Sequence, residues 1–261
     1  MKNIKDKVVV ITGGAGLLGR QYVQAIRDIE GIPVVLDTDP EAEEKCRCLC
    51  INCNITQPTE VHHALQTIIS EYSKVPYGLI NNAAIDPKFG DSNEKPQSRL
   101  EEYSVFQWNA EIAVGLTGAF LCTQVFGERM ALAKSGSIIN ISSVLGHVAP
   151  NQALYRKDGI SNGMQPVKPV TYSVIKHGII GLTRYTATYW ANKGVRCNAL
   201  SPGGVYNNHS EQFVEKLSKY IPMGRMAERD EYNEAIKFLI SDASSFMTGA
   251  VLNIDGGQTT W

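Results

Sequence analysis

The chain has 261 residues, of which 43% are hydrophobic and 20% are charged, and its formal net charge is −1. These values are typical of a globular protein with one sizeable core. The near-neutral charge gives no electrostatic case for nucleic acid or an anionic membrane surface, and no stretch approaches the roughly 18 uninterrupted apolar residues of a membrane span.

Short β-rich runs alternate with amphipathic helical stretches along the whole chain. We expect strands at 8–11, 34–36, 49–51, 79–80, 138–141, 195–200 and 251–254. Helical faces are indicated by Val61, Ala64, Leu65, Ile68, Ile69 and Tyr72, and by Tyr232, Ala235, Ile236, Leu239 and Ile240. This alternation predicts right-handed βαβ units and a parallel sheet covered on both faces, an α/β protein formed as a single domain over 1–261.

A glycine-rich turn, TGGAGLLG at 12–19, follows the first expected strand and opens a helix. Glycines there permit a tight turn and let backbone N–H groups approach a pyrophosphate at the helix N-terminus. Asp37 ends the second strand, where a carboxylate can accept hydrogen bonds from an adenosine ribose and would repel a 2′-phosphate. The pair favours NAD over NADP; the alternative for Asp37 is a residue that merely starts a turn.

Four of the six cysteines lie close together at Cys46, Cys48, Cys50 and Cys53. The first three alternate, which predicts thiols along one face of a strand, a poor arrangement for surrounding a tetrahedral metal. We therefore expect no metal site and small core-lining thiols. Reduced cysteines, and an N-terminus without a convincing signal-peptide cleavage site, favour a cytoplasmic location.

Tyr172 and Lys176 are four residues apart in an expected helix, so their side chains share one face. A free phenol is a poor base at neutral pH, but a neighbouring ammonium favours the phenolate and makes the tyrosine an effective proton donor or acceptor. The alternative is a helix with an exposed lysine and a half-buried tyrosine.

With these features in order, the chain resembles the short-chain dehydrogenase/reductase family over essentially its whole length. The matching features are TGGAGLLG, Asp37, Asn81-Asn82-Ala83, INISS at 139–143, Tyr172 with Lys176, Pro202-Gly203, and Thr248-Gly249 with Asp255-Gly256-Gly257. The resemblance implies a Rossmann-type, doubly wound parallel sheet in three α/β/α layers. It also implies nicotinamide-dependent hydride transfer to or from a carbonyl carbon.

The resemblance assigns catalytic roles to Ser143, Tyr172 and Lys176. Tyr172 is the expected acid/base, Lys176 supports it and holds the nicotinamide ribose, and Ser143 binds the substrate oxygen while Ser142 points elsewhere. Contacts to NAD, with NADP less favoured, are expected from Gly13, Gly16, Leu18, Gly19, Asp37, Asn54, Ile55, Asn82, Ala83, Ala84, Tyr172, Lys176, Pro202, Gly203 and Val205.

The sequence departs from the family pattern in three places. Leu17 stands where members of this length have glycine, so the glycine spacing is that of the epimerase-like branch. Gly115 replaces an asparagine that holds a water behind the lysine, although a break in the helix at this glycine would still admit a water. The stretch between Ser143 and Tyr172 is also longer than in the family.

Two segments rich in turn-forming residues, 86–99 and 147–169, precede helices at strand ends, where open α/β sheets bind ligands. The 147–169 insertion carries Arg156, Lys157 and Lys168 and leads into the Tyr172 helix. It is either a solvated loop or a wall over the pocket whose cations meet an anionic substrate, such as a sugar phosphate or nucleotide sugar. The insertion resembles that of reductases of bacterial surface-carbohydrate biosynthesis, and 207–223 is the expected lid.

The Tyr172 helix is apolar on more than one side, which indicates a homo-oligomer, a dimer or the homotetramer common in the family. The sequence favours an NAD-dependent oxidoreductase acting on a secondary alcohol or ketone of a sugar-like substrate. An epimerase or dehydratase that retains its NAD, and a non-catalytic NAD-sensing protein, are the alternatives.

Overall fold

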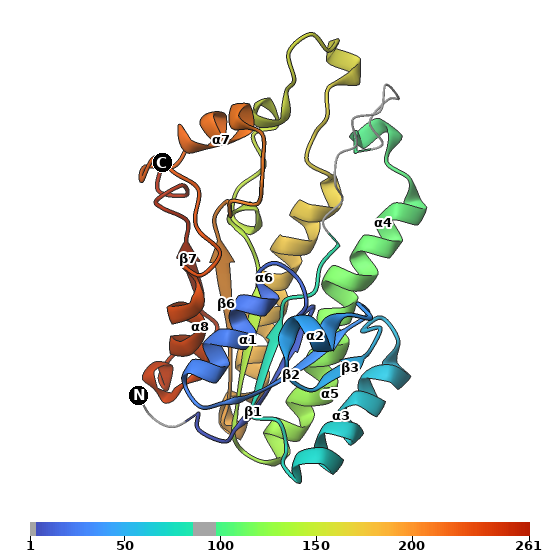
Figure 1. Cartoon of the computed structure of the whole chain (residues 1–261), viewed down its shortest axis with the longest axis vertical. Helices are drawn as coiled ribbons and strands as arrows, with labels where there is room; N and C mark the ends of the chain where they lie inside the picture. Colours follow the sequence, from blue (N-terminus) through green and yellow to red (C-terminus); the bar gives the residue numbers. More distant parts are fainter. Residues whose placement is uncertain (1–3, 86–97) are drawn as a thin grey trace.

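The computed structural model describes residues 4–85 and 98–261, so most of the expected 86–99 segment lies outside the described part. Its strands form one parallel sheet in the order β3-β2-β1-β4-β5-β6-β7 (Figure 1). They are β1 (Val8–Thr12), β2 (Ile32–Asp37), β3 (Cys50–Asn52), β4 (Gly78–Asn81), β5 (Gly136–Ile141), β6 (Val195–Pro202) and β7 (Val251–Ile254). The predicted doubly wound parallel sheet is confirmed.

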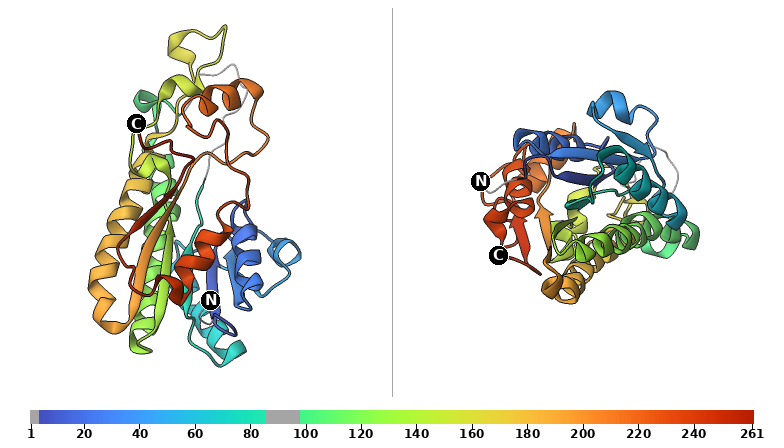
Figure 2. Two further views of the ribbon diagram at one scale, coloured as in Figure 1. Left: turned by 90° about the vertical axis from the view of Figure 1, so that its left-hand side faces the viewer. Right: turned by 90° about the horizontal axis from the view of Figure 1, so that it is seen from below.

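Helices cover both faces of the sheet (Figure 2). They are α1 (Gly19–Asp28), α2 (Ala42–Cys46), α3 (Pro58–Tyr72), α4 (Val105–Ile112), α5 (Ala119–Leu132), α6 (Val170–Trp190), α7 (Glu211–Ser218) and α8 (Asn233–Ile240). A π-helical segment, Ala113–Gly118, joins α4 to α5. The joined helix, Val105–Leu132, is long and apolar enough to cross a membrane by length and composition alone, and here it packs against the sheet.

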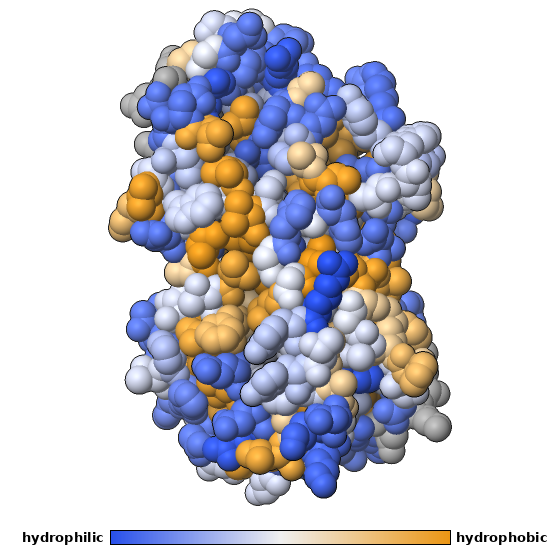
Figure 3. Space-filling model, turned by 180° about the vertical axis from the view of Figure 1, so that it is seen from behind, coloured by the Kyte–Doolittle hydropathy of each residue, from blue (hydrophilic) through white to orange (hydrophobic). Residues whose placement is uncertain are grey.

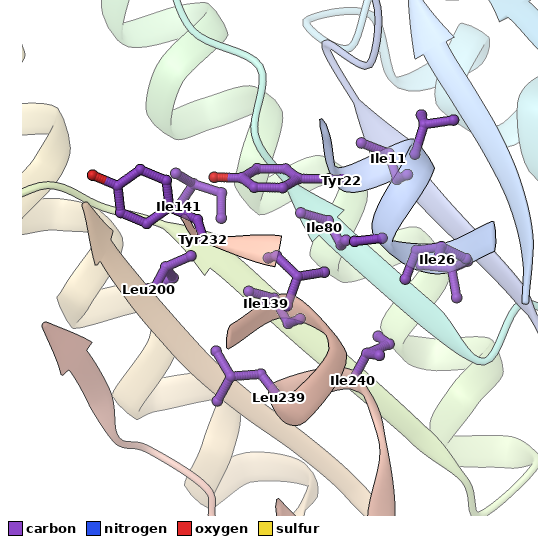
Figure 4. Close-up of a cluster of buried hydrophobic side chains, with 14 of the residues drawn as sticks. Ile11, Tyr22, Ile26, Ile80, Ile139, Ile141, Leu200, Tyr232, Leu239 and Ile240 are labelled. Carbon is purple, nitrogen blue, oxygen red and sulfur yellow. The ribbon is translucent and has the colours of Figure 1, made fainter. Parts of the chain in front are cut away.

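Alternation along the buried strands divides the core into two layers. Val9 and Ile11 of β1 face α1 and α8, where the largest buried side chains include Tyr22 and Tyr232 (Figure 4). Val8 and Val10 face α3, α5 and α6. Because the strands are buried on both faces, they are nearly continuous hydrophobic runs, which is why the sequence shows them clearly.

The strand order reverses at β1, which pairs with β2 on one side and β4 on the other. Ligands of open α/β sheets bind outside the carboxyl ends of the strands at such a point. The glycine turn after β1 and the Asn82–Ala84 loop after β4 both lie there. The topology thus places the predicted cofactor residues together.

The predicted strand of alternating cysteines is wrong. Cys46 is the last residue of α2, Arg47 adopts a left-handed conformation with φ of 53°, and Cys50 begins β3. All six cysteines are free, and the Cys46 thiol donates to the Gly14 carbonyl at 3.4 Å. Burial raises the pKa of Cys46, Cys48 and Cys50, so these thiols favour the protonated, unreactive form.

Candidate functional site

A pocket of about 990 Å³ opens at the carboxyl ends of the strands. It is lined by nearly all the predicted site residues: Gly13, Gly16, Leu18, Asp37, Asn54, Ile55, Asn82, Ala83, Ala84, Ser143, Tyr172, Lys176, Pro202, Gly203 and Val205. Gly19 is the exception. It sits behind the glycine turn, where a Cβ would lie 2.2 Å from the Gly13 carbonyl oxygen, so it allows close packing of the turn on α1.

Gly13 is required by both backbone conformation and space. Its φ is +62°, and a Cβ there would lie 2.8 Å from the Cα of Ala83. The turn after β1 therefore approaches the loop after β4 closely. This approach brings the two walls of the predicted dinucleotide site together without side chains between them.

Thr12 and Asn82 fasten these two loops to each other. The Thr12 hydroxyl accepts hydrogen bonds from the backbone N–H groups of Asn82 and Ala83, at 3.0 and 3.1 Å. The Asn82 amide donates to the carbonyls of Thr12 and Gly13 at 3.1 and 2.9 Å. Sequence reasoning missed Thr12, although a threonine that ends a strand before a glycine turn was a usable signal.

Asp37 lies at the far end of the pocket with both carboxylate oxygens engaged by backbone. Oδ2 accepts from the N–H of Ala15 at 2.9 Å, and Oδ1 accepts from the N–H of Asp39 at 3.1 Å. Asp39 also lines this end and pairs with Lys45 at 2.7 Å. The Asp37 carboxylate is held rigidly against the glycine turn, so an adenosine ribose there would meet negative charge.

The expected adenine contact from Asn54 is partly occupied. Its side-chain oxygen accepts hydrogen bonds from the Thr56 N–H and hydroxyl, at 3.1 and 2.8 Å. This turn leaves the Asn54 amide nitrogen as the side-chain group that could serve a ligand. Ile55 lies beside it in the pocket wall.

Ser143, Tyr172 and Lys176 converge on the opposite half of the same pocket. The Lys176 ammonium lies 5.6 Å from the centre of the Tyr172 ring and donates to the Ile141 carbonyl at 2.9 Å. The Ser143 hydroxyl accepts from the Leu145 N–H at 3.2 Å. Ser142 turns away and donates to the Lys176 carbonyl at 2.9 Å, which fastens α6 to the end of β5.

The outer wall of the pocket is mainly apolar and comes from the 147–169 insertion and the 207–223 segment, which lie together above the sheet (Figure 1). The two segments are joined by a small apolar cluster of Leu217, Ile221 and Met226 with Leu154, Phe213 and Val214. The Tyr155 and Phe213 rings are 5.7 Å apart, and Gln212 donates to Asp158 at 2.8 Å.

Of the three insertion cations, only Lys168 lines the pocket as the described residues form it. Its ammonium lies 3.9 Å from the centre of the Tyr172 ring, within cation–π range. The side chain thus stands over the ring of the predicted catalytic tyrosine. Over residues 4–85 and 98–261, no cluster of three or more His, Cys, Asp or Glu side chains is arranged to hold a metal ion.

Two family models together match the chain over nearly its whole length. Residues 7–156 match the family model described as short chain dehydrogenase, and residues 159–259 match the model described as enoyl-(acyl carrier protein) reductase. The chain is 30% identical to cis-4-hydroxycyclohexanecarboxylate dehydrogenase of Sinomonas cyclohexanicum, with 97% of each chain covered. It is 32% identical to a 3-oxoacyl-acyl-carrier-protein reductase of Thermotoga maritima, covering 97% of this chain and 98% of the relative.

Among solved structures, a short chain dehydrogenase from Leptospira borgpetersenii with bound NAD+ superimposes with a TM-score of 0.85 at 29% identity. The match covers 99% of this chain and 96% of that one.

Proposed function

Because the chain belongs to the short-chain dehydrogenase family, we propose that Ser143, Tyr172 and Lys176 carry out hydride transfer between NAD and a secondary alcohol or ketone. The protein is an NAD-binding oxidoreductase that acts on CH–OH groups. The observation that carries the residue assignment is the convergence of these three side chains on the pocket that also contains the glycine turn and Asp37.

Each of the three residues has a separate task. The chemistry supplied by a bound NAD would be that of hydride acceptor for the substrate carbon, or of hydride donor in its reduced form. Ser143 holds the substrate oxygen by a hydrogen bond, and Tyr172 takes up or gives back the proton at that oxygen. The Lys176 ammonium, fixed by the Ile141 carbonyl and 5.6 Å from the centre of the Tyr172 ring, would hold the ribose of the nicotinamide nucleotide beside the phenol.

A Tyr172→Phe variant tests this assignment. We expect kcat/KM to fall by about 100-fold or more, because general acid–base catalysis contributes roughly 10²–10⁴-fold. Binding of NAD, followed by quenching of tryptophan fluorescence, should persist since the glycine turn is untouched. Undiminished hydride transfer in this variant would overturn the mechanism.

The same assay separates the alternative functions on this fold. A dehydrogenase accumulates NADH in proportion to the alcohol consumed. An epimerase or dehydratase, suggested by the spacing of Gly13, Gly16 and Gly19, would retain its cofactor without net turnover. A purely NAD-sensing protein would bind NAD and show no reaction, and it has no evident need for the polar cluster around Tyr172.

We propose further that the substrate is a sugar-like or cyclic polyol that carries an anionic group, a phosphate or a carboxylate, close to Lys168. Support comes from the position of its ammonium over the Tyr172 ring, in the lining of the pocket. A relative named for a hydroxycyclohexanecarboxylate acts on a secondary alcohol of this charge. The apolar outer wall would pack against the carbon skeleton.

Matched substrates test the role of Lys168. Sugar phosphates and hydroxy acids are compared with their neutral counterparts, the free sugars and the hydroxy amides, in Lys168→Met and in a Lys157→Met control outside the pocket lining. We expect Lys168→Met to lower kcat/KM about 10–100-fold for the anions alone, the effect of losing one charged hydrogen bond. Equal losses for charged and neutral substrates would contradict this proposal.

We also propose that the protein assembles as a homo-oligomer in the cytoplasm, a dimer or a tetramer. The relatives reported above are dehydrogenases and reductases of varied substrates, so they lend no support to the resemblance to enzymes of bacterial surface-carbohydrate biosynthesis. That role therefore remains a sequence-based prediction.

A further inference from the structure

A buried carboxylate that the mechanism does not use lies beside the catalytic helix. Glu111 of α4 is 4% exposed. One of its oxygens accepts from the Gln107 amide at 3.0 Å, and the other accepts from the Tyr103 hydroxyl at 2.8 Å and from the Thr171 hydroxyl. All of these donors are neutral. A buried carboxylate needs hydrogen-bond donors on its oxygens, and these three side chains supply donors to both oxygens of Glu111.

The Glu111 cluster joins α4 to the first turn of α6. Thr171 is the second residue of α6 and is fully buried, and its hydroxyl lies 2.8 Å from that of Tyr103. Negative charge is favourable at this end of a helix because the backbone N–H groups there are unpaired. Burial raises the pKa of Tyr103 to about 12, so its hydroxyl remains a donor to Glu111 at any ordinary working pH.

One turn further along, α6 also meets the π-helical segment that continues α4. Gly115 lies one turn after Glu111, and Ile175 lies one turn after Thr171. A Cβ on Gly115 would lie 2.8 Å from the nearest Ile175 side-chain atom, so the glycine allows close contact there. Two successive contacts, a polar one to α4 and an apolar one to the π-helical segment, therefore hold the start of α6 against this long helix.

We infer that Glu111 is a positioning residue for the catalytic tyrosine. Tyr172 directly follows Thr171, about 100° further around the helix, so any rotation of the first turn of α6 swings the phenol within the pocket. The family's asparagine is absent here, and Ile175 fills the space at Gly115. The polar link from α4 to α6 lies one turn earlier, at Glu111. This inference rests on the proposed acid–base role of Tyr172.

The test compares substitutions that remove the hydrogen bonds and preserve shape. We expect Glu111→Gln and Thr171→Val each to lower kcat about 10-fold, with the Kd for NAD within about twofold of the parent, because misplacing a reacting group by about 1 Å can cost 100-fold. Thr171→Ser, which restores the hydroxyl, should recover most of the activity. The kcat of the double variant should be no lower than that of the less active single variant, because both substitutions break the same link between α4 and α6. Glu128→Gln is the control, an exposed glutamate on the continuous α4–α5 helix.

A purely structural role gives a different result. The inference is overturned if Glu111→Gln lowers the melting temperature but leaves kcat unchanged when activity is assayed well below that temperature. It is also overturned if the affinity for NAD falls in parallel with kcat. If Glu111→Gln does not fold, Tyr103→Phe replaces it, because this variant removes a single donor to Glu111. The same result is expected, a lower kcat with the affinity for NAD unchanged. Full activity of Tyr172→Phe would instead reject the proposed function, so the two failures are distinguishable.

Discussion

At the scale of a single residue, we expect Asp37 to determine which nicotinamide cofactor binds in the pocket. Its two oxygens are held by the N–H groups of Ala15 and Asp39, so the carboxylate cannot turn away from a ligand. We expect Asp37→Ala to weaken NAD binding about 10–100-fold, the loss of a charged hydrogen bond, and to improve NADP binding because the repulsion of its 2′-phosphate is removed. Titration of the parent protein and of the variant with NAD and with NADP gives the Kd values that measure the change.

Asp39→Asn provides the matched control for that prediction. Asp39 lies at the same end of the pocket, but Lys45 already offsets its charge at 2.7 Å. Its neutralisation should alter the ratio of NADP to NAD affinity less than the Asp37 substitution does. An unchanged ratio in Asp37→Ala would assign cofactor selection to other groups.

Local geometry decided which individual residues could be placed from the sequence. The side chains of Ser142 and Ser143 have different partners, as the sequence predicts for neighbouring residues at the end of an extended strand. The substrate-binding role of Ser143 stays a prediction. The alternation of Cys46, Cys48 and Cys50 gave a wrong strand, because the left-handed Arg47 ends α2 within the pattern. Nothing in the local pattern marked Glu111, whose partner Thr171 lies 60 positions away.

The π-helical segment is the feature that the sequence defines least at the scale of elements. Its residues, Ala113–Gly118, have no composition that demands a π-helix; the segment lies where Gly115 meets Ile175 of another helix. The sequence did suggest a break at Gly115. The larger asparagine of the family pattern would collide with Ile175 at this position, so a simple Gly115→Asn replacement is not expected to restore the family's water site.

Gly115→Ala should therefore destabilise the protein. Alanine in a helix ordinarily gains about 1 kcal/mol over glycine, but overpacking a buried contact costs about 1–3 kcal/mol, and the second effect should win. Gly163→Ala is the control: a Cβ on this exposed glycine of the 147–169 insertion would have nothing within 4 Å, so no loss of stability is expected. Urea unfolding midpoints report both, and the loss should shrink in an Ile175→Ala background. A stabilised Gly115→Ala protein would disprove the packing argument.

For the molecule as a whole, the sheet and its layers could be predicted because buried parallel strands leave long hydrophobic runs, each followed by a helix with one apolar face. The pocket's cofactor half followed from the same pattern, since its residues stand at strand ends. Its substrate half did not, because the insertion and 207–223 meet through side chains such as Tyr155 and Phe213 that no short motif pairs.

The outer surface of α5 and α6 carries exposed aromatic side chains that bear on how the molecule assembles. Tyr185 and Tyr189 of α6 are 67% and 61% exposed and stack on each other, and Phe120 of α5 is 46% exposed. Seen from behind, apolar residues gather in a band between two polar ends of the molecule (Figure 3). A face of this kind is typical of a surface covered by a second copy.

We expect sedimentation at micromolar concentration to show a dimer or a larger species. The double variant Phe120→Glu/Tyr185→Glu should convert this species to monomers with the fold intact. Phe246→Glu, at a fully exposed position near β7, distinguishes the two sizes: it should leave a dimer unchanged, but convert a tetramer to dimers if that edge is the second interface. A parent protein that sediments as a monomer would refute the assembly.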